Sequence, residues 1–129
     1  MPEDSAVDRL LARSRAALER VAPDALGEQV AAGALVVDVR PEQDRRRDGP
    51  LPGAVAVERI HLEWRLDPTS EHRLPEAAPG RRVILVCNEG YASSLAAATL
   101  RELGIDATDV AGGYRAWRAR QPIVPAAAP

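Results

Sequence analysis

The residues best suited to chemistry lie in one short segment, which contains the only cysteine of the chain, Cys87. The apolar and mainly β-branched run 83–86 precedes it, and the alanine-rich run 95–103 follows. This order predicts a strand buried on both faces that leads into a helix of a parallel α/β sheet. Cys87 then stands at the end of the strand and opens the loop that joins strand to helix.

The predicted loop favours a negative charge on the cysteine sulfur. Gly90 permits a backbone turn that would be strained for other residues, so the N–H groups of this loop can turn toward Cys87. The positive end of the following helix, which Ser93 or Ser94 could cap, adds to their effect. A thiolate in this setting is a ready nucleophile. The alternative is that Cys87 is a small buried apolar residue that ends a strand.

The loop resembles the active-site loop of rhodanese-like sulfurtransferases, in which cysteine opens a short loop with glycine three residues later. Three more segments resemble that family, in the family's order along the chain, and together the four extend from about Pro23 to Trp117. The four segments are Asp38-Val39-Arg40 at the end of a second apolar run, the turn 49–54, the loop Cys87-Asn88-Glu89-Gly90-Tyr91-Ala92-Ser93-Ser94, and Gly112-Gly113-Tyr114 with Trp117.

The resemblance implies the fold class and the division of the chain. It implies an α/β protein with a single rhodanese-like domain, in which helices flank both faces of a five-stranded parallel sheet. The cysteine loop would lie at the carboxyl edge of the central strand. We expect an N-terminal amphipathic helix packed on the domain within 1–22, the domain itself at 23–120, and a flexible tail at 121–129. Ser5 has the spacing of a capping box at the start of the first helix.

The resemblance also implies sulfur transfer by double displacement. The Cys87 thiolate would take a sulfane sulfur from thiosulfate or a persulfide and pass it, as a cysteine persulfide, to cyanide or a thiol. The N–H groups of the loop from Asn88 to Ser93 would hold the developing anion. Asp38 and Arg40 would support the site, paired with each other or with the active-site region. The mechanism requires no metal and no organic cofactor.

One loop position departs from many thiosulfate-using members of the family, which carry arginine as the sixth loop residue counted from cysteine. Ala92 stands there, so a charge-assisted clamp on an anionic donor is missing, and a persulfide becomes the more credible donor. Arg40 and Arg115 are the candidates to compensate for the missing arginine.

Two other functions stay open. One is a catalytically weak rhodanese-like binding or regulatory module. The other is a cysteine phosphatase, which needs arginine where this chain has Ser93.

Composition narrows the class of protein further. The 129 residues, 46% hydrophobic and 28% charged, suit one soluble domain. A net charge of −2 predicts no attraction to nucleic acid or anionic lipid, and no apolar run suggests a signal peptide or a membrane span. One cysteine cannot form an internal disulfide, and two histidines without a cysteine partner argue against a metal site. We therefore expect a cytoplasmic protein whose partners are a small-molecule or protein sulfur donor and acceptor, in an oligomeric state that the sequence leaves open.

Overall fold

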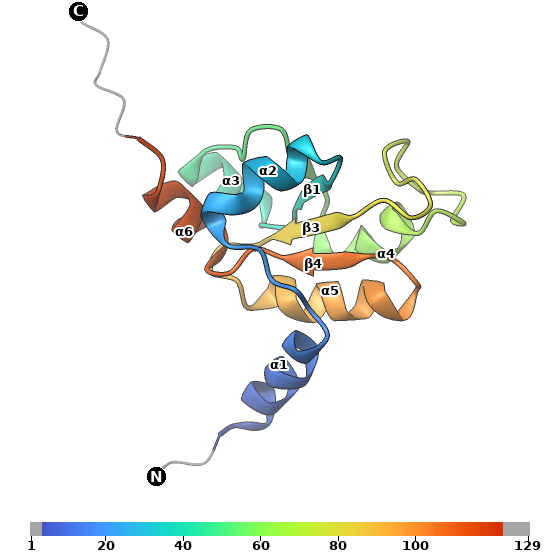
Figure 1. The fold of residues 1–129 in the computed structure, drawn as a ribbon, viewed down its shortest axis with the longest axis horizontal. Helices are drawn as coiled ribbons and strands as arrows, with labels where there is room; N and C mark the ends of the chain where they lie inside the picture. Colours follow the sequence, from blue (N-terminus) through green and yellow to red (C-terminus); the bar gives the residue numbers. More distant parts are fainter. Residues whose placement is uncertain (1–3, 123–129) are drawn as a thin grey trace, which may run out of the picture.

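A parallel sheet lies at the centre of the fold, with helices on both of its faces (Figure 1). The structure is a computed structural model, and it describes residues 4–122. The elements in chain order are α1 (Ala6–Ala16), η1 (Pro23–Ala25), α2 (Leu26–Ala31), β1 (Leu35–Asp38), α3 (Glu42–Asp48), β2 (Val55–Ala56), η2 (Arg59–His61), α4 (Leu62–Leu66), β3 (Val83–Val86), α5 (Ala92–Glu102), β4 (Ala107–Asp109) and α6 (Gly113–Ala119).

The sheet has four strands in the order β2-β1-β3-β4, so the expected number of five is wrong. Val21 occupies the place beside β4 where a fifth strand would lie, but it forms only an isolated parallel bridge with Val110. Its N–H donates to the carbonyl of Asp109 at 2.9 Å. The segment cannot extend this pairing, because Pro23 lacks an N–H group and begins the short helix η1 two residues later.

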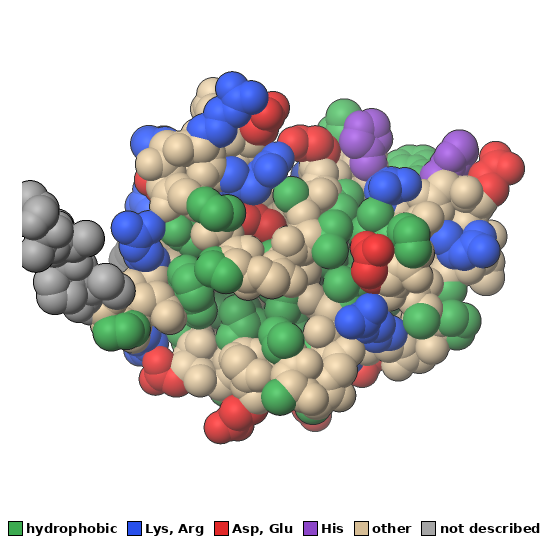
Figure 2. All heavy atoms as spheres, turned by 90° about the horizontal axis from the view of Figure 1, so that it is seen from above, with side chains coloured by type: hydrophobic (Ala, Val, Ile, Leu, Met, Phe, Trp, Pro, Cys, Tyr) green, Lys and Arg blue, Asp and Glu red, His purple; other side chains and the backbone are tan. Residues whose placement is uncertain are grey.

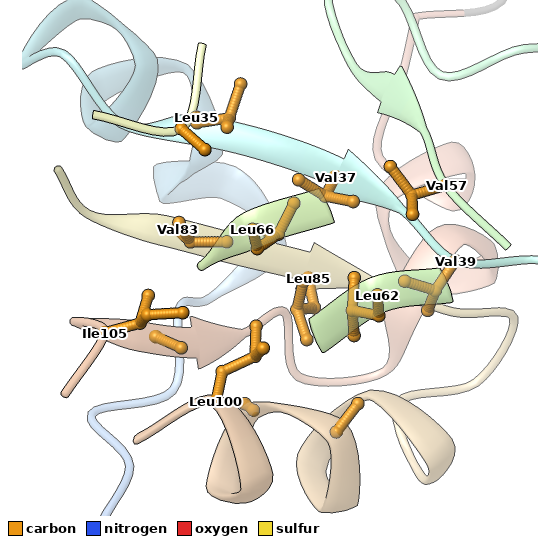
Figure 3. Close-up of a cluster of buried hydrophobic side chains, with 14 of the residues drawn as sticks. Leu35, Val37, Val39, Val57, Leu62, Leu66, Val83, Leu85, Leu100 and Ile105 are labelled. Atoms are coloured by element: carbon orange, nitrogen blue, oxygen red, sulfur yellow. The ribbon is translucent and has the colours of Figure 1, made fainter. Parts of the chain in front are cut away.

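Successive side chains of β1 and β3 point to opposite faces of the sheet and fill two separate cores. Both strands are buried along their whole length, which explains why each is a continuous apolar run rather than an alternating one. Val37 pairs with Leu85 across the two strands, and both point into the core that Figure 3 shows. Val36 and Ile84 point into the other core.

A different pair of helices covers each of the two cores. On one face, Leu62 and Leu66 of α4 meet Leu100 of α5 over the sheet (Figure 3). On the other face, Leu26 of α2 and Tyr114 of α6 pack against β3 and β1. These two layers hold the strand ends, and therefore the loops that come after them, in fixed positions.

Helix α1 lies outside these layers and packs against α5 on the side away from the sheet (Figure 1). Ser5 caps it through a complete capping box with Asp8, as the sequence predicts. Ser14 is its only buried residue, whereas Val7 and Leu10 are exposed. Apolar burial therefore contributes little to the attachment of α1.

The three-arginine run lies on α3 and is neutralised by carboxylates around it. Arg46 pairs with Glu42 at 2.7 Å, and Arg47 pairs with Asp48 at 2.9 Å. On the face that Figure 2 shows, basic and acidic side chains are interspersed in the same way. This arrangement gives no continuous basic surface on that face.

Two further expectations concern a membrane span and the C-terminal tail. None of the helices in residues 4–122 has the length and apolar character that a membrane span requires. The expected tail, 121–129, falls largely outside the described residues, which end at Pro122.

Candidate active site

Cys87 comes directly after β3, at the carboxyl edge of the sheet, and lies at the wall of an open cavity of about 410 Å³. The residue is 7% exposed, so its thiol is largely covered but still reaches the cavity. The carboxyl edge of a parallel sheet is where ligands bind in open α/β folds. The cavity is lined by Val39, Arg40, Pro41, Arg59, Cys87, Asn88, Glu89, Tyr91 and Ala92.

The loop after Cys87 turns main-chain donors toward the sulfur, as its glycine and length predict. The Gly90 N–H donates to Sγ at 3.1 Å, and the Ser93 N–H donates at 3.4 Å. The Ser93 Oγ lies 3.2 Å from Sγ as well. Gly90 has φ of +85°, a conformation that glycine adopts without strain. The sulfur therefore lies among donors that stabilise an anion.

Two further groups of the same loop are suited to an anion in the cavity. Among the described residues, the main-chain N–H groups of Tyr91 and Ala92 find no hydrogen-bond acceptor. Both residues line the cavity beside Cys87. They belong to the start of α5, where unpaired N–H groups and the helix dipole together favour negative charge.

The expected serine cap of α5 is wrong. The helix begins at Ala92, its N-cap is Tyr91, and no side chain caps it. Ser93 and Ser94 lie in its first turn, fully buried, and donate their hydroxyls to Asp109 at 2.8 and 2.7 Å. A buried carboxylate needs hydrogen-bond donors on its oxygens, and the two serines are placed to supply them.

Asp109 is one of the residues near Cys87 that sequence reasoning missed. It ends β4, is 0% exposed, and forms an ion pair with Arg20 at 2.8 Å. Through Ser93 it is linked to the Cys87 sulfur by two successive hydrogen bonds. A signal did exist, because a carboxylate at the end of a strand parallel and adjacent to β3 must come to the same edge of the sheet.

Asp38 and Arg40 pair with each other rather than with the cysteine loop. The Arg40 Nη2 lies 2.7 Å from Asp38 Oδ2, and both side chains are buried. The guanidinium also stacks on the Tyr114 ring at 3.7 Å. Burial opposes the charge of Arg40, but hydrogen bonds and attraction from Asp38 outweigh it and raise the pKa of Arg40 above its ordinary value. The pair therefore holds the cavity wall next to Cys87.

Gly112 and Gly113 let the start of α6 pass against the back of the cysteine loop. A Cβ atom on Gly113 would lie 2.5 Å from the Cys87 carbonyl oxygen, which leaves no room for a side chain. Beside it, the Tyr114 N–H donates to that same oxygen at 2.8 Å, and the Arg115 N–H donates to the Asn88 oxygen at 3.0 Å. The two glycines thus serve both as a tight turn and as a close contact with the loop.

The charged side chains around the cavity differ from the expected ones. Arg115 pairs with Glu89 at 2.6 Å and does not line the cavity, so it does not replace the missing loop arginine. Arg59 of η2 does line it and pairs with the partly exposed Glu63 at 2.8 Å. No local pattern in the sequence points to Arg59, because only the tertiary fold brings η2 to this edge.

Comparison with known proteins gives a consistent result. The rhodanese-like domain model matches residues 22–120. A search of curated protein sequences finds no match. A solved structure of a protein of unknown function from Rhodopseudomonas palustris, described as a possible tyrosine phosphatase, is 29% identical, with a TM-score of 0.81, and the match covers 96% of this chain and 99% of that one.

Two other solved structures match over most of their own length. A rhodanese homologue from Thermus thermophilus is 33% identical, with a TM-score of 0.57, over 76% of this chain and 99% of that one. A human single-domain sulfurtransferase is 24% identical, with a TM-score of 0.63, over 80% of this chain and 97% of that one. The family model, the shared fold and the four motifs agree: the chain belongs to the rhodanese-like domain family.

Proposed function

We propose that the protein is a sulfurtransferase that carries a sulfane sulfur on Cys87. The observation that carries this proposal is the position of Sγ, at the wall of an open cavity with the N–H groups of Gly90 and Ser93 directed at it. These donors stabilise a thiolate, which is the reactive form of cysteine. The same loop offers the free N–H groups of Tyr91 and Ala92 to a second anionic atom in the cavity, as a persulfide would place there.

The reaction proceeds in two displacements at sulfur. The Cys87 thiolate attacks the outer sulfur of the donor, a sulfur–sulfur bond forms at Cys87, and the donor's own sulfur–sulfur bond breaks with its electron pair on the leaving thiolate or sulfite. The acceptor, cyanide or a thiolate, then attacks the outer sulfur of the persulfide. The sulfur–sulfur bond of the persulfide breaks with its electron pair on Cys87, which returns as a thiolate. No external oxidant or reductant is consumed.

The Ser93 hydroxyl can serve the sulfur in both of its protonation states. In the thiol state the S–H group donates to Ser93 Oγ at 3.2 Å, while the hydroxyl donates to Asp109. Once the thiol proton has left to solvent, the hydroxyl can rotate and donate to the thiolate. Asp109 then keeps its bonds from Arg20 and Ser94, so no buried charge is left without a partner.

The donor that fits this cavity best is a persulfide. Ala92 supplies no charge, and the guanidinium of Arg40 is held by Asp38, which disfavours the doubly charged thiosulfate. Arg59 remains on the cavity wall to meet the single negative charge of a persulfide. Its ion pair with Glu63 is partly exposed and therefore weak enough to exchange for a ligand. A reducing compartment such as the cytoplasm keeps the lone thiol available for this chemistry.

A second function is suggested by the Rhodopseudomonas palustris structure, which is described as a possible tyrosine phosphatase. Phosphoryl transfer by cysteine needs a cationic clamp on the phosphoryl oxygens, and Ser93 occupies the place of the arginine that would supply it. We therefore favour sulfur transfer. Hydrolysis of a phenyl phosphate that is lost in Cys87→Ser would favour the phosphatase instead.

Mass spectrometry of the intact protein tests the proposal. The purified protein is incubated with thiosulfate or a low-molecular-weight persulfide, and Cys87→Ala serves as the control. We expect a gain of one sulfur atom that cyanide removes and that the variant does not show. Absence of any adduct across these donors would contradict the proposal and favour a binding or regulatory module.

A further inference from the structure

Two arginines from the segment that precedes the matched domain reach the cysteine loop. Arg15 lies in the last turn of α1, and Arg20 lies just before Val21, whereas the family model begins at residue 22. The Arg15 Nη2 donates to the Gly90 carbonyl at 2.7 Å, and the Arg20 Nη2 donates to the same oxygen at 2.8 Å. One main-chain carbonyl of the loop thus receives two charged hydrogen bonds from outside the domain.

Gly90 is the loop residue whose backbone conformation depends most on contacts of this kind. Its N–H is the nearer main-chain donor to the Cys87 sulfur, at 3.1 Å. Glycine has more backbone freedom than any other residue, so nothing in its own chemistry keeps this N–H directed at sulfur. The two arginines hold its carbonyl, and a Cβ atom placed on Gly90 would lie 2.8 Å from the main-chain nitrogen of Gly112 and 3.1 Å from Arg20 Nη2. Gly90 is therefore enclosed between the N-terminal segment and the start of α6.

Arg20 also fixes the second donor to the sulfur, through Asp109. It donates to the two carboxylate oxygens of Asp109 at 2.8 and 3.2 Å. Asp109 in turn accepts the hydroxyl of Ser93, whose N–H and Oγ both contact the sulfur. A carboxylate that is 0% exposed is stabilised by a charged partner that donates hydrogen bonds to its oxygens. Arg20 thus connects to both residues that surround Sγ.

Arg15 makes further contacts with the same loop and helix. Its Nε donates to Ser94 Oγ at 3.1 Å, and its guanidinium carbon lies 5.4 Å from the centroid of the Tyr91 ring, which is at the rim of the cavity. Since Ser14 is the only buried residue of α1, these polar contacts help to attach α1 to the loop and to α5.

We infer that Arg15, Arg20 and Asp109 are positioning residues for Cys87, and that the N-terminal segment 6–20 is therefore part of the active site. This inference rests on the proposed function, in that the positioned sulfur is the one proposed to carry a sulfane sulfur. The three side chains act through Gly90 and Ser93 and do not touch the sulfur themselves. Loss of one of them should loosen the loop and weaken the stabilisation of the thiolate.

The test measures the rate of alkylation of Cys87 by iodoacetamide as a function of pH in the full chain. In Arg15→Gln and Arg20→Gln we expect a rate at neutral pH about tenfold lower than in the wild type, because a hydrogen bond to a charged group is weakened. The half-maximal rate should move to higher pH. Arg13→Gln is the matched control, since Arg13 lies on the same helix but is exposed and forms no side-chain hydrogen bond or ion pair within residues 4–122. Arg15→Lys, which keeps one charged donor, should restore part of the rate.

The outcomes separate this inference from the proposed function, because alkylation requires no sulfur transfer. A changed pH profile in Arg15→Gln or Arg20→Gln supports the inference even if the wild-type protein transfers no sulfur. Profiles identical to that of Arg13→Gln overturn it, even if the wild-type protein is an active sulfurtransferase. Arg20→Gln leaves Asp109 without its cation, and if that variant fails to fold, Arg15→Gln alone decides by the same two criteria.

Discussion

The contact between Gly113 and the cysteine loop allows the effect of one substitution to be worked out in detail. In Gly113→Ala, the added methyl group would lie 2.5 Å from the Cys87 carbonyl oxygen and 2.8 Å from the Asn88 carbonyl carbon. Both atoms are main chain, so no flexible side chain can move aside. The loop itself must shift away from α6, and with it the N–H groups directed at sulfur.

The magnitude of the effect is the sum of two separable costs. Gly113 has φ of +62°, and an alanine there costs about 1–2 kcal/mol of backbone strain. Overpacking against the loop adds about 1–3 kcal/mol. Gly53→Ala is the matched control, because Gly53 has φ of +80° but no atom within 4 Å of its added Cβ. It should show the strain alone. The difference between the two variants is then the cost of displacing the loop.

Two measurements on each variant test this reasoning. Urea unfolding gives the loss of free energy of unfolding, expected to be about 2–5 kcal/mol for Gly113→Ala and about 1–2 kcal/mol for Gly53→Ala. Alkylation of Cys87 under native conditions should slow in Gly113→Ala and stay unchanged in Gly53→Ala. Equal losses of stability together with equal alkylation rates would refute the claim that α6 holds the cysteine loop in place.

Three further predictions concern the donor clamp, the buried ion pair and acid. Ala92→Arg should raise kcat/KM for thiosulfate about tenfold or more by restoring a charge-assisted clamp; an unchanged value in steady-state assays counts against that account. Asp38→Asn leaves the buried Arg40 without its counter-charge, so denaturant unfolding should show a loss of about 3–5 kcal/mol; a loss below about 1 kcal/mol contradicts this. Hydrogen bonds from the N–H and hydroxyl of Thr69 lower the pKa of Asp67 below its ordinary value. Its contribution to stability is therefore full above that ordinary value and is lost as pH falls through the lowered one. Asp67→Asn should thus be less stable than the wild type at pH 7, with a gap that closes in acid; a gap that persists there is the opposing result.

Local patterns were enough to predict the inner strand that leads to Cys87. The run 83–86 coincides with β3, because a strand buried on both faces has a continuous apolar sequence that no exposed element shares. The expected fifth strand is wrong because strand formation at Val21 depends on the residues after it, and Pro23 ends the pairing after one bridge. The serine cap is wrong because Asp109, far away in sequence, takes both hydroxyls.

The parts of the site that sequence reasoning missed come from long-range contacts. Arg15 and Arg20 reach Gly90 from about 70 residues away, and Arg59 lines the cavity from η2, a separate element of the chain. Spacing along the chain carries no information about such contacts. The position of Cys87 at a strand end was predictable because the strand and the glycine that comes after it are adjacent in sequence. Its chemical role stays a prediction.

Transfer of a labelled sulfur in a single turnover tests the central claim most directly. A low-molecular-weight persulfide labelled in its outer sulfur is mixed with the protein, the excess is removed, and cyanide is added. We predict that one labelled sulfur atom binds per Cys87 and leaves as labelled thiocyanate. A protein that takes up no label, or that keeps it when cyanide is added, would contradict the claim that the amides around Cys87 hold a sulfur for transfer.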